Sequence, residues 1–128
     1  MGGNARTSPP ALLAGLDVLL VEDEIVIAFL VEDMLRDLGC HRVFHAGTVG
    51  EALAILDEQR LQLAVLDVNL GDSTAYPVAE RLHDLAIPFV FATGYGLRGL
   101  DPRWAATTVL QKPFDARVLA AALRTVLR

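Results

Sequence analysis

Four apolar runs of the sequence each end in polar side chains that could bind a phosphate group or a metal ion. The carboxylates of Glu22, Asp23 and Asp67 follow two of these runs, the hydroxyl of Thr93 follows a third, and the amine of Lys112 follows a fourth. If the runs are parallel strands, their carboxyl ends share one edge of a sheet and the groups meet in one crevice. Clustered carboxylates repel one another unless a cation lies among them, and Mg²⁺ prefers such oxygen ligands. The spacing therefore predicts a magnesium site beside a phosphate cradle that includes Thr93 and Lys112.

Short apolar runs and amphipathic stretches alternate along the chain, and they supply the elements that must position these groups. The expected strands cover residues 18–21, 42–46, 63–66, 88–92 and 109–110. The expected helices contain Ile27 to Leu38 ended by Gly39, Ala52 to Leu56 behind a Thr48 and Glu51 capping box, Val78 to Leu85 entered through Pro77, and Leu119 to Val126. Alternation of strands and helices predicts an α/β fold, namely a doubly wound, five-stranded parallel sheet of the flavodoxin-like type.

The connection between the fourth and fifth strands differs from the others. Glycines at several positions between residues 94 and 99 oppose an ordinary helix. An Asp101 cap with Pro102 at the first position leaves room for one turn, so we expect a short or irregular fourth helix. Trp104 is expected to pack this turn, and the alternative is that it anchors a partner.

Length and composition predict a single domain at residues 15–128 behind a flexible tail at residues 1–14. The chain has 128 residues, 53% of them hydrophobic, and a formal net charge of −5. No basic stripe that could neutralise nucleic-acid phosphates is present, and no apolar segment approaches the ~20 residues of a membrane span. Cys40 is the single cysteine, which fits a reducing compartment. We expect a cytoplasmic protein that binds no nucleic acid directly and does not insert into membranes.

Four short motifs resemble the receiver domain of bacterial two-component response regulators, in the subfamily with a Phe-Ala-Thr-Gly-Tyr motif. They are Val-Glu-Asp-Glu at 21–24, Leu-Asp-Val-Asn-Leu at 66–70, Phe-Ala-Thr-Gly-Tyr at 91–95 and Gln-Lys-Pro-Phe at 111–114. Each motif alone is weak, but their order and their places at the expected strand ends make the resemblance specific.

The resemblance implies that Asp67 accepts a phosphoryl group from the phosphohistidine of a sensor histidine kinase or a phosphotransfer protein. It implies an Mg²⁺ site made of Glu22, Asp23, Asp67 and the backbone carbonyl of Asn69. It also implies that Lys112 contacts the phosphoryl group and that Thr93 closes on it after transfer. The bond before Pro113 is expected to be cis, as is usual in the family.

One position departs from the family pattern. An aromatic switch residue commonly lies three positions before the lysine, and Val109 occupies that place here. We expect Tyr95, just past Thr93, to take over the switching role. Asn69 and Tyr95 flank the approach of water in receivers, so they are expected to tune the dephosphorylation rate.

The resemblance predicts a signalling module and not an enzyme, apart from its own phosphorylation and dephosphorylation. Phosphorylation would switch a surface formed by the fourth and fifth strands and the helices that follow them, and a downstream effector protein would read that surface. One alternative is an Mg²⁺-dependent phosphohydrolase that forms a phosphoaspartate, but such enzymes use a second acid where Asn69 lies. Another alternative is a docking-only, receiver-like domain. Taken singly, each site residue also has a plainer interpretation, such as Glu22 and Asp23 in a solvated first helical turn.

Overall fold

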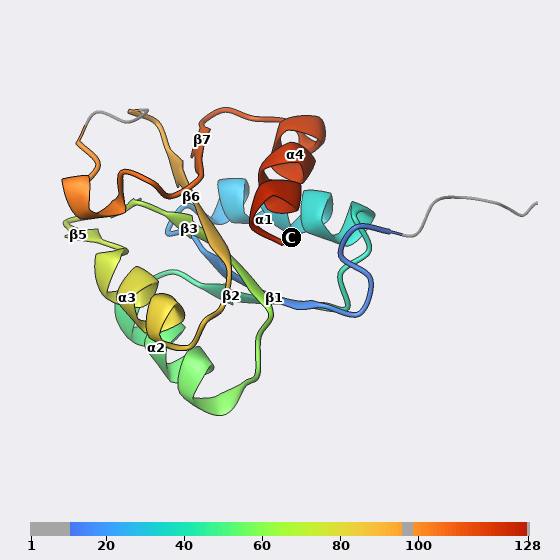
Figure 1. Cartoon of the computed structure of the whole chain (residues 1–128), viewed down its shortest axis with the longest axis horizontal. Coiled ribbons are helices and arrows are strands. Elements are labelled where there is room, and N and C mark those ends of the chain that lie inside the picture. The colour runs from blue at the N-terminus through green and yellow to red at the C-terminus, as the bar shows by residue number, and fades with distance from the viewer. Residues whose placement is uncertain (1–10, 96–98, 128) are drawn as a thin grey trace, which may run out of the picture.

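The computed structural model describes residues 11–95 and 99–127 (Figure 1). In chain order, the elements are β1 (Asp17–Val21), α1 (Ile25–Asp37), β2 (Arg42–Ala46), α2 (Val49–Glu58), β3 (Leu63–Asp67), β4 (Asn69–Leu70), β5 (Ser73–Thr74), α3 (Tyr76–Asp84), β6 (Phe89–Thr93), a 3₁₀ turn (Pro102–Trp104), β7 (Val109–Gln111) and α4 (Ala116–Val126). No helix among the described residues is both long and apolar enough to span a bilayer.

The main sheet has five parallel strands in the order β2-β1-β3-β6-β7. This arrangement confirms the predicted doubly wound sheet. The strand order places β1 and β3 side by side at the centre, with β6 and β7 next to them on one side. The carboxyl ends of these four strands therefore lie on one edge of the sheet, as the sequence predicts.

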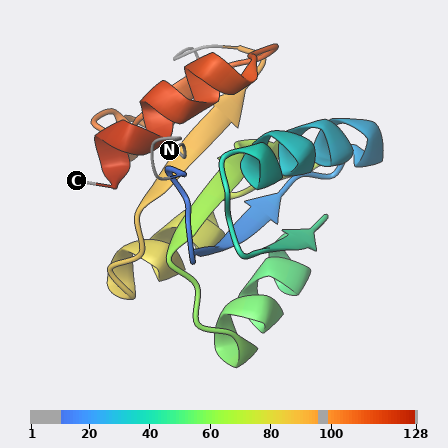
Figure 2. The same ribbon diagram turned by 90° about the vertical axis from the view of Figure 1, so that its right-hand side faces the viewer.

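Helices cover both faces of the sheet, with α1 and α4 on one side and α2 and α3 on the other (Figures 1 and 2). Alternate strand residues supply two separate apolar cores. Leu20 and Val65 belong to the core under α1 and α4, whereas Leu19 and Leu66 belong to the core under α2 and α3. A strand that is buried on both faces must be apolar at consecutive positions, which explains the unbroken runs in the sequence.

Helix ends follow the predicted signals. Thr48 caps α2, with its hydroxyl accepting a hydrogen bond from the backbone N–H of Glu51 at 3.1 Å. Gly39 follows α1 with a φ of +96°, a left-handed conformation that favours glycine. A Cβ at Gly39 would also collide with the side chain of Ala11, which lies against this turn.

The N-terminal boundary of the packed structure needs a correction. Most of the tail expected at residues 1–14 lies outside the described residues, and the packed fold was expected to begin near Leu16. Leu13, however, is fully buried between α1 and α4, and its N–H donates to the carbonyl of Leu38 at 2.9 Å. The turn that contains Leu13 therefore belongs to the packed structure, because the Leu13 side chain lies in the same core as apolar residues of α1 and α4.

In the described part of the fourth crossover, residues 99–108, the chain forms one 3₁₀ turn, as the sequence predicts. The Asp101 carboxylate accepts from the N–H of Arg103 at 2.9 Å, and Pro102 opens the turn. Trp104 is buried and lies edge-on to Phe91, with ring centroids 6.0 Å apart, and stacked on Tyr76 at 6.5 Å. The Trp104 ring thus packs against aromatic residues of β6 and α3 on this face of the sheet.

Candidate functional site

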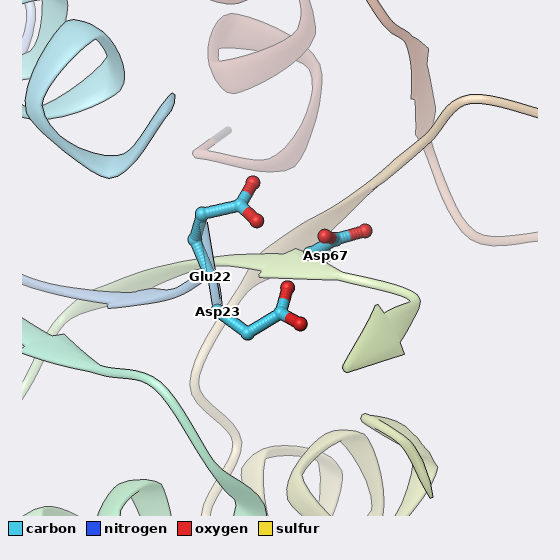
Figure 3. Close-up of side chains that lie close together, drawn as sticks. All are labelled: Glu22, Asp23 and Asp67. Carbon is cyan, nitrogen blue, oxygen red and sulfur yellow. The ribbon is translucent and has the colours of Figure 1, made fainter. Parts of the chain in front are cut away.

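The predicted site residues meet at the carboxyl edge of the sheet. Glu22 and Asp23 follow β1 directly, Asp67 ends β3, Thr93 ends β6, and Lys112 follows β7. Figure 3 shows the carboxylates of Glu22, Asp23 and Asp67 extending from two neighbouring strand ends into the same region. One oxygen from each of the three carboxylates can be chosen so that all lie within 4.8 Å of one another.

Lys112 neutralises part of this charge. Its ammonium group donates to Oε1 of Glu22 at 2.7 Å and to Oδ2 of Asp67 at 3.1 Å. The backbone N–H of Lys112 also donates to the carbonyl of Thr93 at 2.9 Å, which fixes where the lysine leaves the sheet. The bond between Lys112 and Pro113 is cis, as the resemblance implies. Lys112 is the only lysine in the sequence, so its chemistry can be observed without interference from others.

Burial and charge set the protonation of the two buried carboxylates in opposite directions. Burial raises the pKa of Asp67 to about 6, and the neighbouring Glu22 carboxylate adds to the rise, against the opposing effect of Lys112. Burial also acts to raise the pKa of Glu22, but its hydrogen bonds with Lys112, Asp67 and the N–H of Glu24 hold that pKa below its ordinary value. Burial acts to lower the pKa of Lys112, and the two carboxylates more than offset it, so the ammonium form is favoured. Because Glu22 and Asp67 contact the same ammonium group, the two carboxylates titrate as a pair.

The three carboxylates fit a hard divalent cation. All three side chains offer carboxylate oxygens as metal ligands. Asp23 is exposed, and the crevice beside it has room for the water ligands that Mg²⁺ usually keeps. This crevice has a volume of about 310 Å³ and is lined by Asp23, Glu24, Asp67, Asn69, Gly71, Gly94, Tyr95 and Lys112. It is open to solvent, so a partner's side chain could reach Asp67 directly.

Asn69 lies in a small hairpin that the sequence did not predict. Its backbone N–H lies 3.4 Å from Oδ1 of Asp67, and its strand β4 pairs antiparallel with β5. Gly71 turns the hairpin with a φ of +62°, and a Cβ there would come within 3.8 Å of the Asp23 carboxylate. The available signal was Gly71 followed by Asp72, because a two-residue hairpin loop favours glycine at a position of positive φ.

Thr93 and Tyr95 are linked through the backbone. The Thr93 side chain is 3% exposed, and its Oγ accepts from the N–H of Tyr95 at 3.0 Å. The Tyr95 side chain is 70% exposed and lies at the crevice wall. The structure thus places Thr93 inside the protein at the end of the strand next to β3, and Tyr95 at the wall of the crevice that Asp67 also lines.

The first two turns of α1 expose an apolar surface that the sequence reasoning missed. This α1 patch consists of Ile25, Val26, Phe29 and Leu30, exposed by 57%, 70%, 62% and 56%. The available signal was the unbroken apolar run from residue 25 to 31, because a helix that packs on one side needs only every third or fourth residue to be apolar. The patch starts directly after Glu24, which lines the crevice.

Comparison with known proteins gives consistent results. The sequence model described as the response regulator receiver domain matches residues 18–124. The solution structure of SdrG from Sphingomonas melonis Fr1 is 41% identical, with a TM-score of 0.76 over 91% of this chain and 98% of that one. A BeF3-activated conformation of SdrG is 43% identical, with a TM-score of 0.78 over 90% and 98% of the two chains.

Curated relatives are longer than this chain. The transcriptional regulatory protein AfsQ1 of Streptomyces coelicolor is 34% identical over 117 residues, which cover 87% of this chain and 51% of that protein. The chain spans about half the length of the curated relatives it matches.

Proposed function

Because the chain belongs to the family of response regulator receiver domains, we propose that it accepts a phosphoryl group on Asp67 within a two-component phosphorelay. The donor is the phosphohistidine of a sensor histidine kinase or of a phosphotransfer protein. The observation that carries this proposal is the buried Asp67 carboxylate, which shares the Lys112 ammonium with Glu22 and lines an open crevice.

The transfer is a displacement at phosphorus. An oxygen of Asp67 forms a bond to phosphorus, the bond between phosphorus and the donor's imidazole nitrogen breaks, and the nitrogen keeps the electron pair. Asp67 must be ionised to attack, so its raised pKa has to fall when the site is loaded. The product is an acyl phosphate on a side chain held at the end of a central strand.

Glu22, Asp23, Asp67 and the backbone carbonyl of Asn69 are the proposed Mg²⁺ ligands. The ion, when bound, supplies positive charge that stabilises the ionised carboxylates and the phosphoryl oxygens. Lys112 is already within hydrogen-bonding distance of Asp67, so a small movement of its ammonium group would bring it to a phosphoryl oxygen. The three clustered carboxylates repel one another and so destabilise the fold, but together they would bind the ion that phosphoryl transfer requires.

Thr93 and Tyr95 are the proposed switch. The Thr93 hydroxyl can donate to a phosphoryl oxygen, and because its Oγ also holds the N–H of Tyr95, a movement of Thr93 would pull on the loop that follows β6. Val109 cannot fill the usual aromatic role because valine has no ring, and it is partly buried against the core under α2 and α3. The switching surface would comprise β6, the crossover after it, β7 and α4, and a downstream effector protein would read it.

The α1 patch is the proposed docking surface for the phosphoryl donor. It borders the acceptor crevice, and a groove of about 290 Å³ beside it connects Leu30 and Met34 to Phe114 near Lys112. Exposed carboxylates flank the patch on both sides, with Asp23 and Glu24 before it and Asp33 and Asp37 after it. A donor that presents an apolar helix face bordered by lysines or arginines fits this arrangement, whereas a second copy of this acidic surface would be repelled.

Turnover distinguishes this proposal from a phosphohydrolase. We expect acetyl phosphate with Mg²⁺ to give one phosphoryl group per chain, and p-nitrophenyl phosphate to release no more nitrophenol than buffer alone. Continuous nitrophenol release that depends on Asp67 would contradict the proposal. The Asn69 amide supports the expected outcome, because it cannot protonate an alcohol leaving group.

A further inference from the structure

The peptide unit between Gly94 and Tyr95 is held at both ends by side chains. Its N–H, on Tyr95, donates to Oγ of Thr93 at 3.0 Å, and its carbonyl, on Gly94, accepts from Nε2 of Gln111 at 3.2 Å. Both residues of this peptide line the acceptor crevice beside Asp67. One peptide plane at the wall of the site is therefore fixed by a residue of β6 and a residue of β7.

The sheet register makes this clamp possible. Thr93 and Gln111 are register partners on neighbouring parallel strands, and each is the last residue of its strand. The chain after Thr93 therefore passes in front of the Gln111 side chain, which is exposed. The other carbonyl near the Gln111 amide, that of Lys112, is more distant at 3.5 Å.

The clamp controls where the Thr93 hydroxyl proton can point. A hydroxyl has one donor and two acceptor positions, and the N–H of Tyr95 occupies one acceptor position. The proton must then point away from Tyr95, so it remains available for an acceptor that arrives beside Asp67. The Gln111 hydrogen bond opposes rotation of the peptide, and a hydroxyl whose proton already points toward the acceptor would not need to reorient during transfer.

We infer that Gln111 is a positioning residue for phosphoryl transfer, acting through the Gly94–Tyr95 peptide on the Thr93 hydroxyl. This inference rests on the proposed function of Asp67. Gln111 directly precedes Lys112 in the sequence. Lys112 contacts the acceptor Asp67 directly, whereas Gln111 would act on the site through the peptide. The opposite possibility is that Gln111 holds the loop in its resting position and slows phosphorylation. Loss of the Gln111 amide would then raise the phosphorylation rate, whereas our inference predicts that it lowers the rate.

The test is the rate of phosphorylation by acetyl phosphate and Mg²⁺, followed by intact-protein mass spectrometry. In this reaction the bond between phosphorus and the acetyl oxygen breaks, a bond from phosphorus to an Asp67 oxygen forms, and acetate leaves. Gln111→Met keeps the length of the side chain and removes the N–H donor without adding charge. We expect it to react about threefold to tenfold more slowly than the wild type, the loss typical of one hydrogen bond. Gln59→Met, at the end of α2 and far from the site, is the matched control and should react at the wild-type rate.

A double-mutant cycle separates positioning from general disturbance. If Gln111 acts through Thr93, then Gln111→Met should have no further effect on the slow reaction of Thr93→Ala. A Gln111→Met rate that equals or exceeds the wild-type rate would overturn the inference, and so would an undiminished effect in the Thr93→Ala background. Failure of the wild type to form an adduct would instead overturn the proposed function, so the two failures are distinguishable.

Discussion

The Lys112 ammonium group donates to Oδ2 of Asp67 at 3.1 Å, although 45 residues separate the two in the sequence. The contact arises because β3 and β7 end on the same edge of the sheet, on either side of β6. Lys112 shares its ammonium with Glu22 as well, so a single cation partly offsets the repulsion between two buried carboxylates. Removal of that cation leaves the carboxylates unpaired, and several consequences can be measured.

Lys112→Met should destabilise the metal-free protein and make its stability depend on Mg²⁺. Loss of the partner of a buried charge commonly costs several kcal/mol, and partial solvent access here reduces the expected loss to about 2 kcal/mol. Because Mg²⁺ supplies the missing positive charge, it should restore most of this loss. Urea denaturation with EDTA or with Mg²⁺ measures both effects, with the exposed Arg117→Met as the charge-loss control. Equal stability of Lys112→Met and Arg117→Met in EDTA would contradict the assigned role of the ion pairs.

Asp67 should titrate near pH 6 in the absence of metal. Burial, aided by the Glu22 carboxylate, raises its pKa to about 6, so the acid form predominates below that pH. A protonated Asp67 can neither attack phosphorus nor bind Mg²⁺ well, so the phosphorylation rate at low Mg²⁺ should rise as the pH increases from about 5 to 7. The carboxyl-carbon chemical shift of Asp67 in EDTA measures the midpoint directly.

The Glu22→Gln variant provides the control for this titration. It removes the neighbouring negative charge, so the Asp67 midpoint should move to lower pH. Mg²⁺ should lower the midpoint in the wild type for the same electrostatic reason. A wild-type midpoint below pH 4 in EDTA would show that Lys112 outweighs both burial and Glu22.

Trp104→Ala should destabilise the fold strongly. Trp104 is buried against Phe89, Phe91 and Tyr76, at the end of the 3₁₀ turn before β7. Truncation of a buried tryptophan to alanine costs about 3 kcal/mol or more, and Trp104→Phe should cost much less because an aromatic ring remains. Urea denaturation of the two variants provides the comparison, and a loss below about 1 kcal/mol for Trp104→Ala would contradict the packing role.

Phe29→Asp should impair transfer from a protein donor and leave the reaction with acetyl phosphate unchanged. A small donor needs only the crevice, whereas a helical donor would also cover the exposed Phe29 side chain. The measurement is transfer from purified phosphorylated histidine kinases, assayed one at a time, and we expect a decrease of about tenfold or more for the fastest donor. Leu85→Asp, on an exposed apolar residue of the α3 end, is the matched control. Equal transfer to both variants would place the docking surface elsewhere.

The sequence predicted the parts of the structure that depend on local signals. Strands buried on both faces must be apolar at successive positions, so β1, β3 and β6 were recognisable, and the parallel arrangement then required Asp67 and Lys112 to converge. The Thr48 cap and the Asp101 turn were predictable for a similar reason, since each satisfies backbone N–H groups a few residues away.

Features that depend on distant contacts could not be predicted. Leu13 looked like part of a polar leader, and only the ends of α1 and α4 explain its burial. The Gln111 clamp requires the register of β6 and β7, which no local pattern specifies. The α1 patch, by contrast, was predictable from the unbroken apolar run at residues 25–31, but that run was attributed entirely to the inward face of the helix.

The central claim is that Asp67 is the phosphoacceptor and requires Mg²⁺. The most direct measurement is intact-protein mass spectrometry after incubation with acetyl phosphate, with and without Mg²⁺, on the wild type and on Asp67→Ala. We predict one phosphoryl adduct that is labile to hydroxylamine, forms only with Mg²⁺ and is absent from Asp67→Ala. An adduct of equal yield on folded Asp67→Ala, or one that forms equally well in EDTA, would contradict the assignment of the site.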